Sequence, residues 1–359
     1  MQDTSRKINL FITELIKNKI DAALIYNLAN KDKHLYYLTG LDIEYCFLLI
    51  LAGQKKVIVY TSILESERVK NILPYEVVVI NKPISRMINY QLKKEKIKKL
   101  AVNFNCMIIN EYNKFKKVLN TKMIDCSDIL TKIRQQKTKQ EQEFIKKACE
   151  ITDKVFTEIL NNFKNFKTEQ NIADFIRQRF YHYNVTESFP TIIASGKNAA
   201  IPHYLPKDIP LNNGFCIIDF GCKYKEYCSD MTRTVFIGKP TAKQIKLYKT
   251  VLSTKKAAEF SIRLNKRCST AEKAARKELG ILQKKFIHGL GHGVGLDVHE
   301  SPNISCRSKD IFLENAVFTI EPGIYFSEEL GIRIEDDYII TKNGLEKLTK
   351  STEQLMIIQ

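Results

Sequence analysis

Residues 288–300 read HGLGHGVGLDVHE and carry three of the six histidines of this 359-residue chain. Four glycines alternate over residues 289–295, which forbids a stable helix and lets the backbone pass close to other groups. The glycines do not form G-x-G-x-x-G, Ser301-Pro302 rules out H-E-x-x-H, and G-x-S-x-G occurs nowhere. A single loop histidine is usually structural. Two histidines beside such glycines, His292 within the run and His299 after it, predict a site if partners exist, and we expect His292 to be held exposed in a special geometry.

Two aspartates supply the first partners, because each interrupts an apolar run. Asp219 lies in CIIDFG (216–221) and Asp230 in CSDMTRT (228–234). A tight connection at residues 223–226 would fold the two runs into a hairpin with the carboxylates side by side. One such aspartate is most simply a turn residue. Two on paired strands favour a metal, because a buried carboxylate is costly unless a cation compensates it.

Two glutamates supply the next partners. Glu321 directly follows the apolar run 316–320, and Pro322 ends the strand ladder there. Glu335 lies in GIRIEDD (331–337), where Arg333 and Glu335 are two residues apart and therefore point to one face of a strand. Four strand-borne carboxylates in one domain indicate a polycation. An ordinary salt-bridge network is the competing interpretation.

The chain length predicts about two domains. Residues 1–130 alternate helical and extended patterns, with a helix over 7–19, strands over 22–26, 46–51 and 57–60, and later helix-like and strand-like runs to residue 104. This pattern predicts a mixed-sheet domain. The polar segment 131–143 marks a boundary near residue 130. Beyond it we expect a doubled α+β pattern: helices from 144 and over 168–183, strands over 191–236, helices over 241–264 and 270–284, and strands over 286–358.

Composition excludes several classes of protein. The formal net charge is +17, but the excess is spread along the chain, and the runs 93–99 and 114–117 have helical spacing without aromatic stacking partners. We therefore expect solvated helix faces and no nucleic-acid partner. The nine cysteines contain no C-x-x-C pair, which indicates free thiols. No apolar run is long enough to span a bilayer and the N-terminus is unlike a signal peptide, so we expect no membrane association and a cytoplasmic location.

The motifs HGLGHGVGLDVHESP, IIDFG, SDMTRT, TIEPGIY and GIRIED together resemble the metallopeptidases of the pita-bread fold. This family includes methionine aminopeptidase, prolidase and aminopeptidase P, with creatinase as a non-peptidase relative. The resemblance covers residues 131–359 and implies an α+β pita-bread catalytic domain there. Residues 1–130, with YYLTG at 36–40, resemble the smaller, mixed α/β creatinase-type N-terminal domain of prolidases and aminopeptidases P.

The resemblance also implies a site of two metal ions. Its five ligands would be Asp219, Asp230, His292, Glu321 and Glu335. Asp230 and Glu335 would bridge the ions. Asp219 would complete the coordination shell of one ion, and His292 with Glu321 would complete that of the other. Mostly oxygen donors with one imidazole suit Mn²⁺ first, with Co²⁺ or Zn²⁺ as alternatives.

Three further residues receive catalytic roles from the resemblance. His203 matches a substrate-pocket histidine, His299 the histidine that polarises the scissile carbonyl, and Arg333 the basic residue beside the last ligand. The other histidines (His34, His182 and His288) match no catalytic role. Gly214-Phe215 departs from the family's usual Gly-Asp before the first ligand strand, which affects only a turn.

The resemblance implies an exopeptidase that cleaves a bond to proline in a peptide substrate. We expect an Xaa-Pro aminopeptidase (aminopeptidase P), with prolidase, an Xaa-Pro dipeptidase, as the alternative. A binding module of the same fold would have lost ligands, and creatinase lacks the complete set. Methionine aminopeptidase lacks the N-terminal domain. The resemblance further implies a homodimer.

Overall fold

The computed structural model describes residues 2–28 and 31–359, and the chain divides into two compact units, residues 1–134 and 135–359. The expected boundary after residue 130 lies close to this division. The polar segment around it is largely helical, because α6 (Ser127–Gln135) reaches its beginning and α7 (Lys139–Asn162) starts within it. Thr138 caps α7 through a capping box with Glu141, a start signal that the apolar pattern alone places too late.

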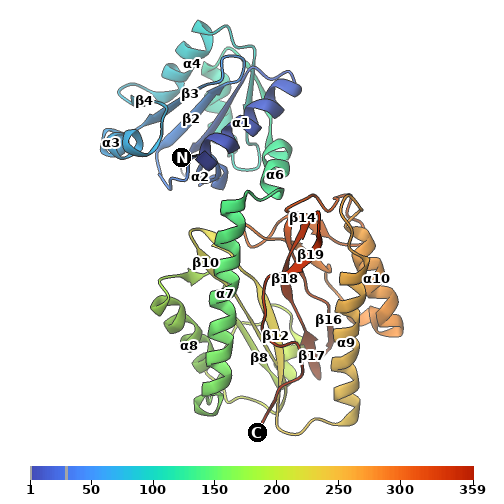
Figure 1. Ribbon diagram of the computed structural model, residues 1–359. Helices are drawn as coiled ribbons and strands as arrows, with labels where there is room; N and C mark the ends of the chain where they lie inside the picture. Colours follow the sequence, from blue (N-terminus) through green and yellow to red (C-terminus); the bar gives the residue numbers. More distant parts are fainter. Residues whose placement is uncertain (1, 29–30) are drawn as a thin grey trace. The chain divides into compact units, whose positions relative to one another are not determined.

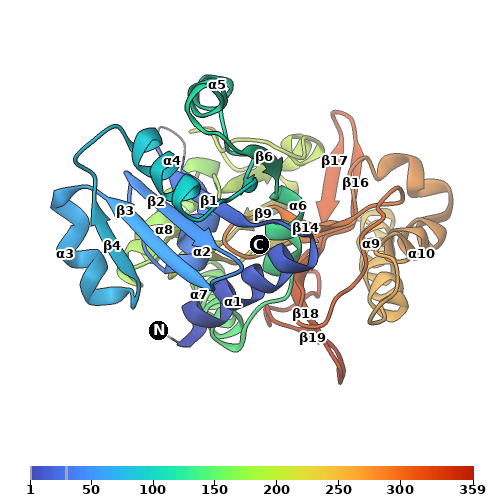
Figure 2. The ribbon, with the colours of Figure 1, turned by 90° about the horizontal axis from the view of Figure 1, so that it is seen from above.

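The N-terminal unit is built on a six-stranded sheet in the order β4-β3-β2-β1-β5-β6. Strands β1, β2 and β3 pair antiparallel, whereas β4, β5 and β6 join in parallel, so the predicted mixed sheet is confirmed. Figure 2 shows β2 and β3 side by side in it. The strands are β1 (Ala22–Asn27), β2 (Cys46–Leu51), β3 (Lys56–Thr61), β4 (Glu76–Val79), β5 (Lys99–Val102) and β6 (Lys122–Asp125).

Helices connect these strands, and the sequence predicts the longer ones better than the short ones. The helix expected over 7–19 spans a few residues more at its start and fewer at its end. The short α2 was not predicted; it is defined by its ends, because Asp32 caps it and Gly40 closes it at a φ of 70°. The helices are α1 (Gln2–Lys17), α2 (Lys33–Thr39), α3 (Ile63–Ile72), α4 (Ile84–Lys94), α5 (Ile109–Val118) and α6.

The C-terminal unit contains two similar halves, each with two helices packed on a sheet; Figure 1 shows α7 and α8 in one half and α9 and α10 in the other. In the first half α7 and α8 (Glu169–His182) pack on a sheet in the order β20-β12-β9-β8. Phe156 and Ile176 from the helices meet Ile218 and Val235 from the strands in its core. The strands are β8 (Ile192–Ser195), β9 (Gly214–Phe220), β12 (Met231–Ile237) and β20 (Ile357–Ile358).

In the second half α9 (Ala242–Ser261) and α10 (Ser269–Leu279) cover a sheet in the order β14-β13-β15-β18-β19 and the hairpin β16-β17. The doubled α+β pattern is therefore confirmed. The strands are β13 (Gly291–Gly293), β14 (Glu300–Ile304), β15 (Val317–Ile320), β16 (Gly323–Phe326), β17 (Leu330–Arg333), β18 (Asp336–Thr341) and β19 (Gly344–Lys347). A small sheet of β7 (Thr186–Glu187), β10 (Cys222–Tyr224) and β11 (Tyr227–Cys228) completes the unit.

None of the nine cysteines, all of which lie within the described residues, forms a disulfide; Cys106 and Cys306 are half-buried and the other seven are buried. Within residues 2–28 and 31–359, no helix is both long and apolar enough to cross a membrane.

Candidate metal centre and substrate cavity

The first half of the C-terminal unit contributes two carboxylates from paired strands. β9 and β12 pair antiparallel, with Asp219 opposite Thr232, and Asp230 directly precedes β12. The predicted hairpin is present, but its tip is the small pair β10 and β11, which turns at Lys225 and Glu226 with φ of 50° and 66°. Both aspartates are buried, so the sheet itself holds their carboxylates away from solvent.

The second half contributes the two glutamates from strand ends. Glu321 lies between β15 and β16, and Glu335 lies between β17 and β18. Thr232 fixes Glu335 twice: its carbonyl accepts the Glu335 N–H at 3.1 Å, and its hydroxyl donates to Glu335 Oε2 at 2.6 Å. As predicted, Arg333 and Glu335 face one side, toward the cavity, while Ile332 and Ile334 are in the core.

The glycine run brings His292 to the same place. A Cβ on Gly291 would lie 2.1 Å from the Thr319 carbonyl oxygen, and one on Gly293 the same distance from that of Ser301. Only glycine lets β13 lie so close to its neighbours, and the register shifts between His292 and Gly293. The expected exposure of His292 is wrong: its side chain is only 14% exposed, because β14 and β15 flank it.

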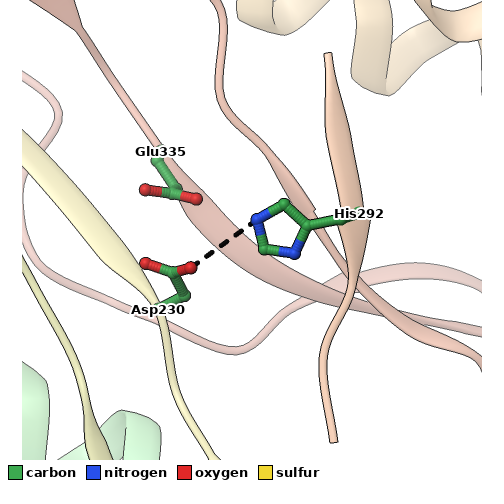
Figure 3. A group of neighbouring side chains, drawn as sticks. All are labelled: Asp230, His292 and Glu335. Atoms are coloured by element: carbon green, nitrogen blue, oxygen red, sulfur yellow. Dashed lines mark ion pairs between the residues drawn. The ribbon is translucent and has the colours of Figure 1, made fainter. Parts of the chain in front are cut away.

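Three of these side chains already form a cluster suited to a cation. Asp230, His292 and Glu335 each offer a ligand atom, and these atoms lie within 4.8 Å of one another (Figure 3). His292 Nε2 lies 3.7 Å from Asp230 Oδ2 and 3.3 Å from Glu321 Oε1. Its Nδ1 lies 3.2 Å from the Gly293 carbonyl oxygen, to which an Nδ1–H donates. That bond leaves Nε2 toward the carboxylates, the usual orientation of a metal-binding histidine.

Electrostatics supports the same interpretation. Burial first, and then repulsion from neighbouring carboxylates, raises the pKa of Asp230 and of Glu335 well above the ordinary values. Burial also raises the pKa of Asp219, although Arg333 opposes it. Glu321 differs: burial raises its pKa, but the hydrogen bond and charge of His292 outweigh this and lower it to about 2.

Four carboxylates, of which Glu321 is half-buried and the other three are buried, therefore share the imidazole of His292 and one guanidinium. Among the described residues, Asp219 Oδ1 has no hydrogen-bond partner, so an acceptor is left for another donor or a cation. A divalent cation fits this donor set of carboxylate oxygens and one imidazole nitrogen.

All eight residues named from the sequence line one cavity of about 830 Å³ in the C-terminal unit. His299 lies beside the cluster, with its ring centroid 4.1 Å from that of His292. His203 follows the short helix η2 (Gly196–Ala200). Burial, and then the charge of His292, lowers the pKa of His299 and keeps its imidazole neutral near pH 7. Another part of the wall is apolar: Phe189, Pro190, Ile192, Leu205 and Val298.

Arg333 is fixed by hydrogen bonds on three of its nitrogens. Nη2 donates to Asp219 Oδ2 at 2.5 Å, Nη1 to the Tyr325 hydroxyl at 2.7 Å, and Nε to the Thr232 hydroxyl at 3.1 Å. Thr232 and Tyr325 were not singled out from the sequence. They lie inside the motifs SDMTRT and TIEPGIY, and their hydroxyl groups within these motifs are the feature by which the sequence could have identified them.

His288 was assigned no catalytic role from the sequence, yet it lines the cavity. Its Nδ1–H donates to the Gly289 carbonyl at 2.8 Å, so Nε2 accepts from the Tyr325 hydroxyl at 3.0 Å. Burial, with the charge of Arg333 as a further cause, lowers its pKa and keeps it neutral. His288 thus aligns Tyr325 beside Arg333.

The fold and these side chains define a class of protein, the pita-bread metallopeptidases with a creatinase-type N-terminal domain. The model of metallopeptidase family M24 matches residues 143–342, and that of the creatinase/prolidase N-terminal domain matches residues 7–136. The chain belongs to metallopeptidase family M24, in the branch of prolidase and aminopeptidase P, and is a metallo-exopeptidase. The family implies divalent metal ions.

Individual relatives are similar over nearly the whole chain. The Xaa-Pro dipeptidase of Pyrococcus horikoshii is 33% identical, covering 99% of this chain and 100% of its own length. Among solved structures, an Xaa-Pro dipeptidase from Bacillus anthracis has a TM-score of 0.91 at 29% identity and covers 99% of this chain and 100% of that one. An X-Pro aminopeptidase from Thermotoga maritima has a TM-score of 0.87 at 29% identity, covering 95% and 98%.

Proposed function

We propose that this protein is an Xaa-Pro dipeptidase that hydrolyses the bond between the first residue and proline, with two divalent ions, Mn²⁺ first. The observation that carries the proposal is the convergence of four carboxylates and His292 on one cavity. The name of the full-length relative favours the dipeptidase over the Xaa-Pro aminopeptidase that we expected from the sequence. The aminopeptidase is the second candidate, because a solved X-Pro aminopeptidase shares the fold closely.

In this proposal five residues hold the ions: Asp219, Asp230, His292, Glu321 and Glu335. Asp230 and Glu335 would be the ligands that both ions share, which agrees with the raised pKa of both carboxyl groups, because a buried ionised carboxylate needs positive charge beside it. When bound, two such ions supply a hydroxide nucleophile near neutral pH and positive charge beside the scissile carbonyl.

The other residues of the cavity bind and orient the peptide. His299, neutral and beside His292, donates a hydrogen bond to the carbonyl oxygen as negative charge develops there. His203 contacts the substrate at the cavity wall. Arg333 keeps its guanidinium in one orientation, and its charge and hydrogen bond oppose the rise in the pKa of Asp219 that burial causes.

The apolar part of the wall is the proposed place for the proline ring. Such a ring has no amide N–H to satisfy, so an apolar surface binds it without an unpaired donor. The residues concerned are Phe189, Pro190, Ile192, Leu205 and Val298.

Parallel assays of three peptides test this function. Metal-free protein is reloaded with Mn²⁺, Co²⁺ or Zn²⁺ and given Gly-Pro, an Xaa-Pro-Ala tripeptide, or Met-Ala-Ser. We expect the highest kcat/KM on Gly-Pro with Mn²⁺. A clear preference for the tripeptide would favour the aminopeptidase, and cleavage of Met-Ala-Ser alone would remove proline from the proposal.

Three wider expectations stay part of the proposal: a domain boundary near residue 130, a homodimer, and a cytoplasmic location. Sedimentation at micromolar concentration measures the assembly. A monomer with full activity would contradict the homodimer.

A further inference from the structure

The residue after His299 belongs to a buried ion pair. Lys137 Nζ lies 2.7 Å from Glu300 Oε1, and the two side chains are only 1% and 9% exposed. Buried charges of this kind are costly to desolvate, so the pair by itself is weak evidence for added stability. Neither residue is among the proposed ligands, and Glu300 lines the cavity wall.

The Glu300 carboxylate lies against the loop that leads to His299. A Cβ on Gly295 would meet Glu300 Oε1 at 2.5 Å, so the carboxylate occupies the space that a side chain would need. Glu300 Oε2 accepts the Asp297 N–H at 3.4 Å. The carboxylate therefore contacts both ends of the segment 295–297, between His292 and His299.

Lys137 itself is held from the other side. It lies between α6 and α7, where its N–H donates to the Asn315 carbonyl at 3.0 Å and its own carbonyl accepts from Gln142 Nε2 at 3.0 Å. The next residue, Thr138, caps α7. The ammonium group is thus presented from a fixed backbone to a carboxylate that packs on the catalytic loop.

We propose that Lys137 is a positioning residue for His299, acting through Glu300. This inference rests on the proposed role of His299. The ion pair fixes Glu300 and the segment 295–297, and thereby the distance of the His299 imidazole from the scissile carbonyl. A displacement of about 1 Å in such a group lowers turnover roughly 10²-fold.

The direct test is Lys137→Met, measured as kcat, KM and metal content. We expect kcat to fall by roughly 10²-fold with KM within about twofold of wild type, because the change affects the transition state and leaves binding of the substrate in place. Metal content should equal that of wild type. The kcat of Lys137→Arg should be at least about tenfold higher than that of Lys137→Met, because arginine restores the charge. Wild-type kcat in Lys137→Met, or loss of a metal ion, would overturn the proposal.

A double-mutant cycle with His299→Ala separates positioning from general weakening of the fold. If Lys137 acts through His299, Lys137→Met should lower kcat no further once the imidazole is gone. Multiplicative losses would overturn the proposal. Lys146→Met is the matched control, since Lys146, in α7, forms a 2.9 Å ion pair with Glu346 that is exposed to solvent and lies outside the cavity wall.

A second variant keeps the test decisive if Lys137→Met does not fold. Lys137→Met combined with Glu300→Gln removes both charges and leaves no lone buried ion, so it should fold and still show the loss of kcat. A folded double variant with wild-type kcat would overturn the proposal.

Hydrogen exchange of the peptide over residues 294–301 gives a readout that needs no substrate. It should be faster in Lys137→Met than in wild type, and unchanged exchange would contradict the proposal. If the wild-type protein cleaves no Xaa-Pro dipeptide while this exchange responds as expected, the proposed function fails and the positioning survives.

Discussion

Two neighbouring residues belong to oppositely charged surroundings in the C-terminal unit. Glu335 faces the cavity, where buried carboxylates outnumber cations, and its pKa is raised by burial and then by Glu321. Asp336, the next residue, lies in a cluster that we call the ionic core: Arg233, Lys255, Asp336 and Glu353. Burial raises the pKa of Asp336 too, but Arg233 and Lys255 outweigh it and hold this pKa well below its usual range.

Two residues joined by one peptide bond thus have different roles: Asp336 stabilises the fold, and Glu335 is available to the cavity. Arg233 donates to Asp336 Oδ1 at 2.5 Å and also to the Glu335 carbonyl oxygen at the same distance. The ionic core thus holds the backbone under Glu335 and leaves its carboxylate to the cavity. A buried carboxylate with its own cations is structural, whereas one that lacks them is available for a metal ion.

The largest expected effect comes from removing a proposed bridging ligand on the cavity side. Asp230→Ala should lower turnover by roughly 10³-fold or more, because the hydroxide nucleophile depends on both ions. Metal content by mass spectrometry should fall with it. The same loss should follow chelation and desalting of the wild type. Full activity of the chelated protein would contradict the metal site.

The next effect concerns the ionic core. Asp336→Asn removes the carboxylate that pairs with the buried Arg233 and one of the three that pair with Lys255, which should cost about 3–5 kcal/mol of unfolding free energy. The chain has no tryptophan, so urea unfolding is followed by circular dichroism. Glu346→Gln is the control, because the exposed pair of Glu346 with Lys146 should contribute less than about 1 kcal/mol. Equal effects of the two variants would contradict the distinction.

The sequence predicted the cavity side of this comparison better than the ionic core. Asp219, Asp230, Glu321 and Glu335 stand out because each interrupts an apolar run, and a strand's alternation places Arg333 beside Glu335. The convergence of the two halves on one cavity follows from pairing that a single sequence does not show. It was reached through the family's motifs.

The ionic core was missed because its members are far apart in sequence and are ordinary in their local context. Lys255 lies in a helix whose polar residues suggest a solvated face, yet its side chain is fully buried against Asp336. The short helix α2 was missed for a related reason: it is defined by caps rather than by periodicity. Patterns in one segment carry no information about distant partners.

The third effect concerns His299 and tests whether its imidazole is a hydrogen-bond donor or a metal ligand. His299→Ala should lower kcat and kcat/KM together by about 10²–10³-fold, as expected for one lost oxyanion donor. KM should change little, and metal content should stay at the wild-type level. His203→Ala should raise KM instead, because we propose that this residue, which lines the cavity, contacts bound substrate. Loss of a metal ion in His299→Ala would show that His299 is a metal ligand, as proposed for His292.

The smallest effect sharpens the contrast between Glu335 and Asp336. In chelated protein the raised pKa of Glu335 means that the folded state binds its proton more tightly than the unfolded state. Stability from this group is therefore complete below its ordinary pKa of 4.5 and is lost as pH rises through the folded value. Glu335→Gln removes that loss, so the unfolding free energy of the metal-free variant should exceed that of wild type by about 1–3 kcal/mol at pH 8. The gain should be smaller at pH 5.

Asp336 depends on pH in the opposite direction. Its contribution to stability is present above its ordinary pKa of 3.8 and is lost as pH falls through the lowered value. Urea unfolding at both pH values, with and without Mn²⁺, measures the difference. A Glu335→Gln variant that is less stable than wild type without metal would show that this carboxylate is paired like Asp336, and the division between cavity and ionic core would fail.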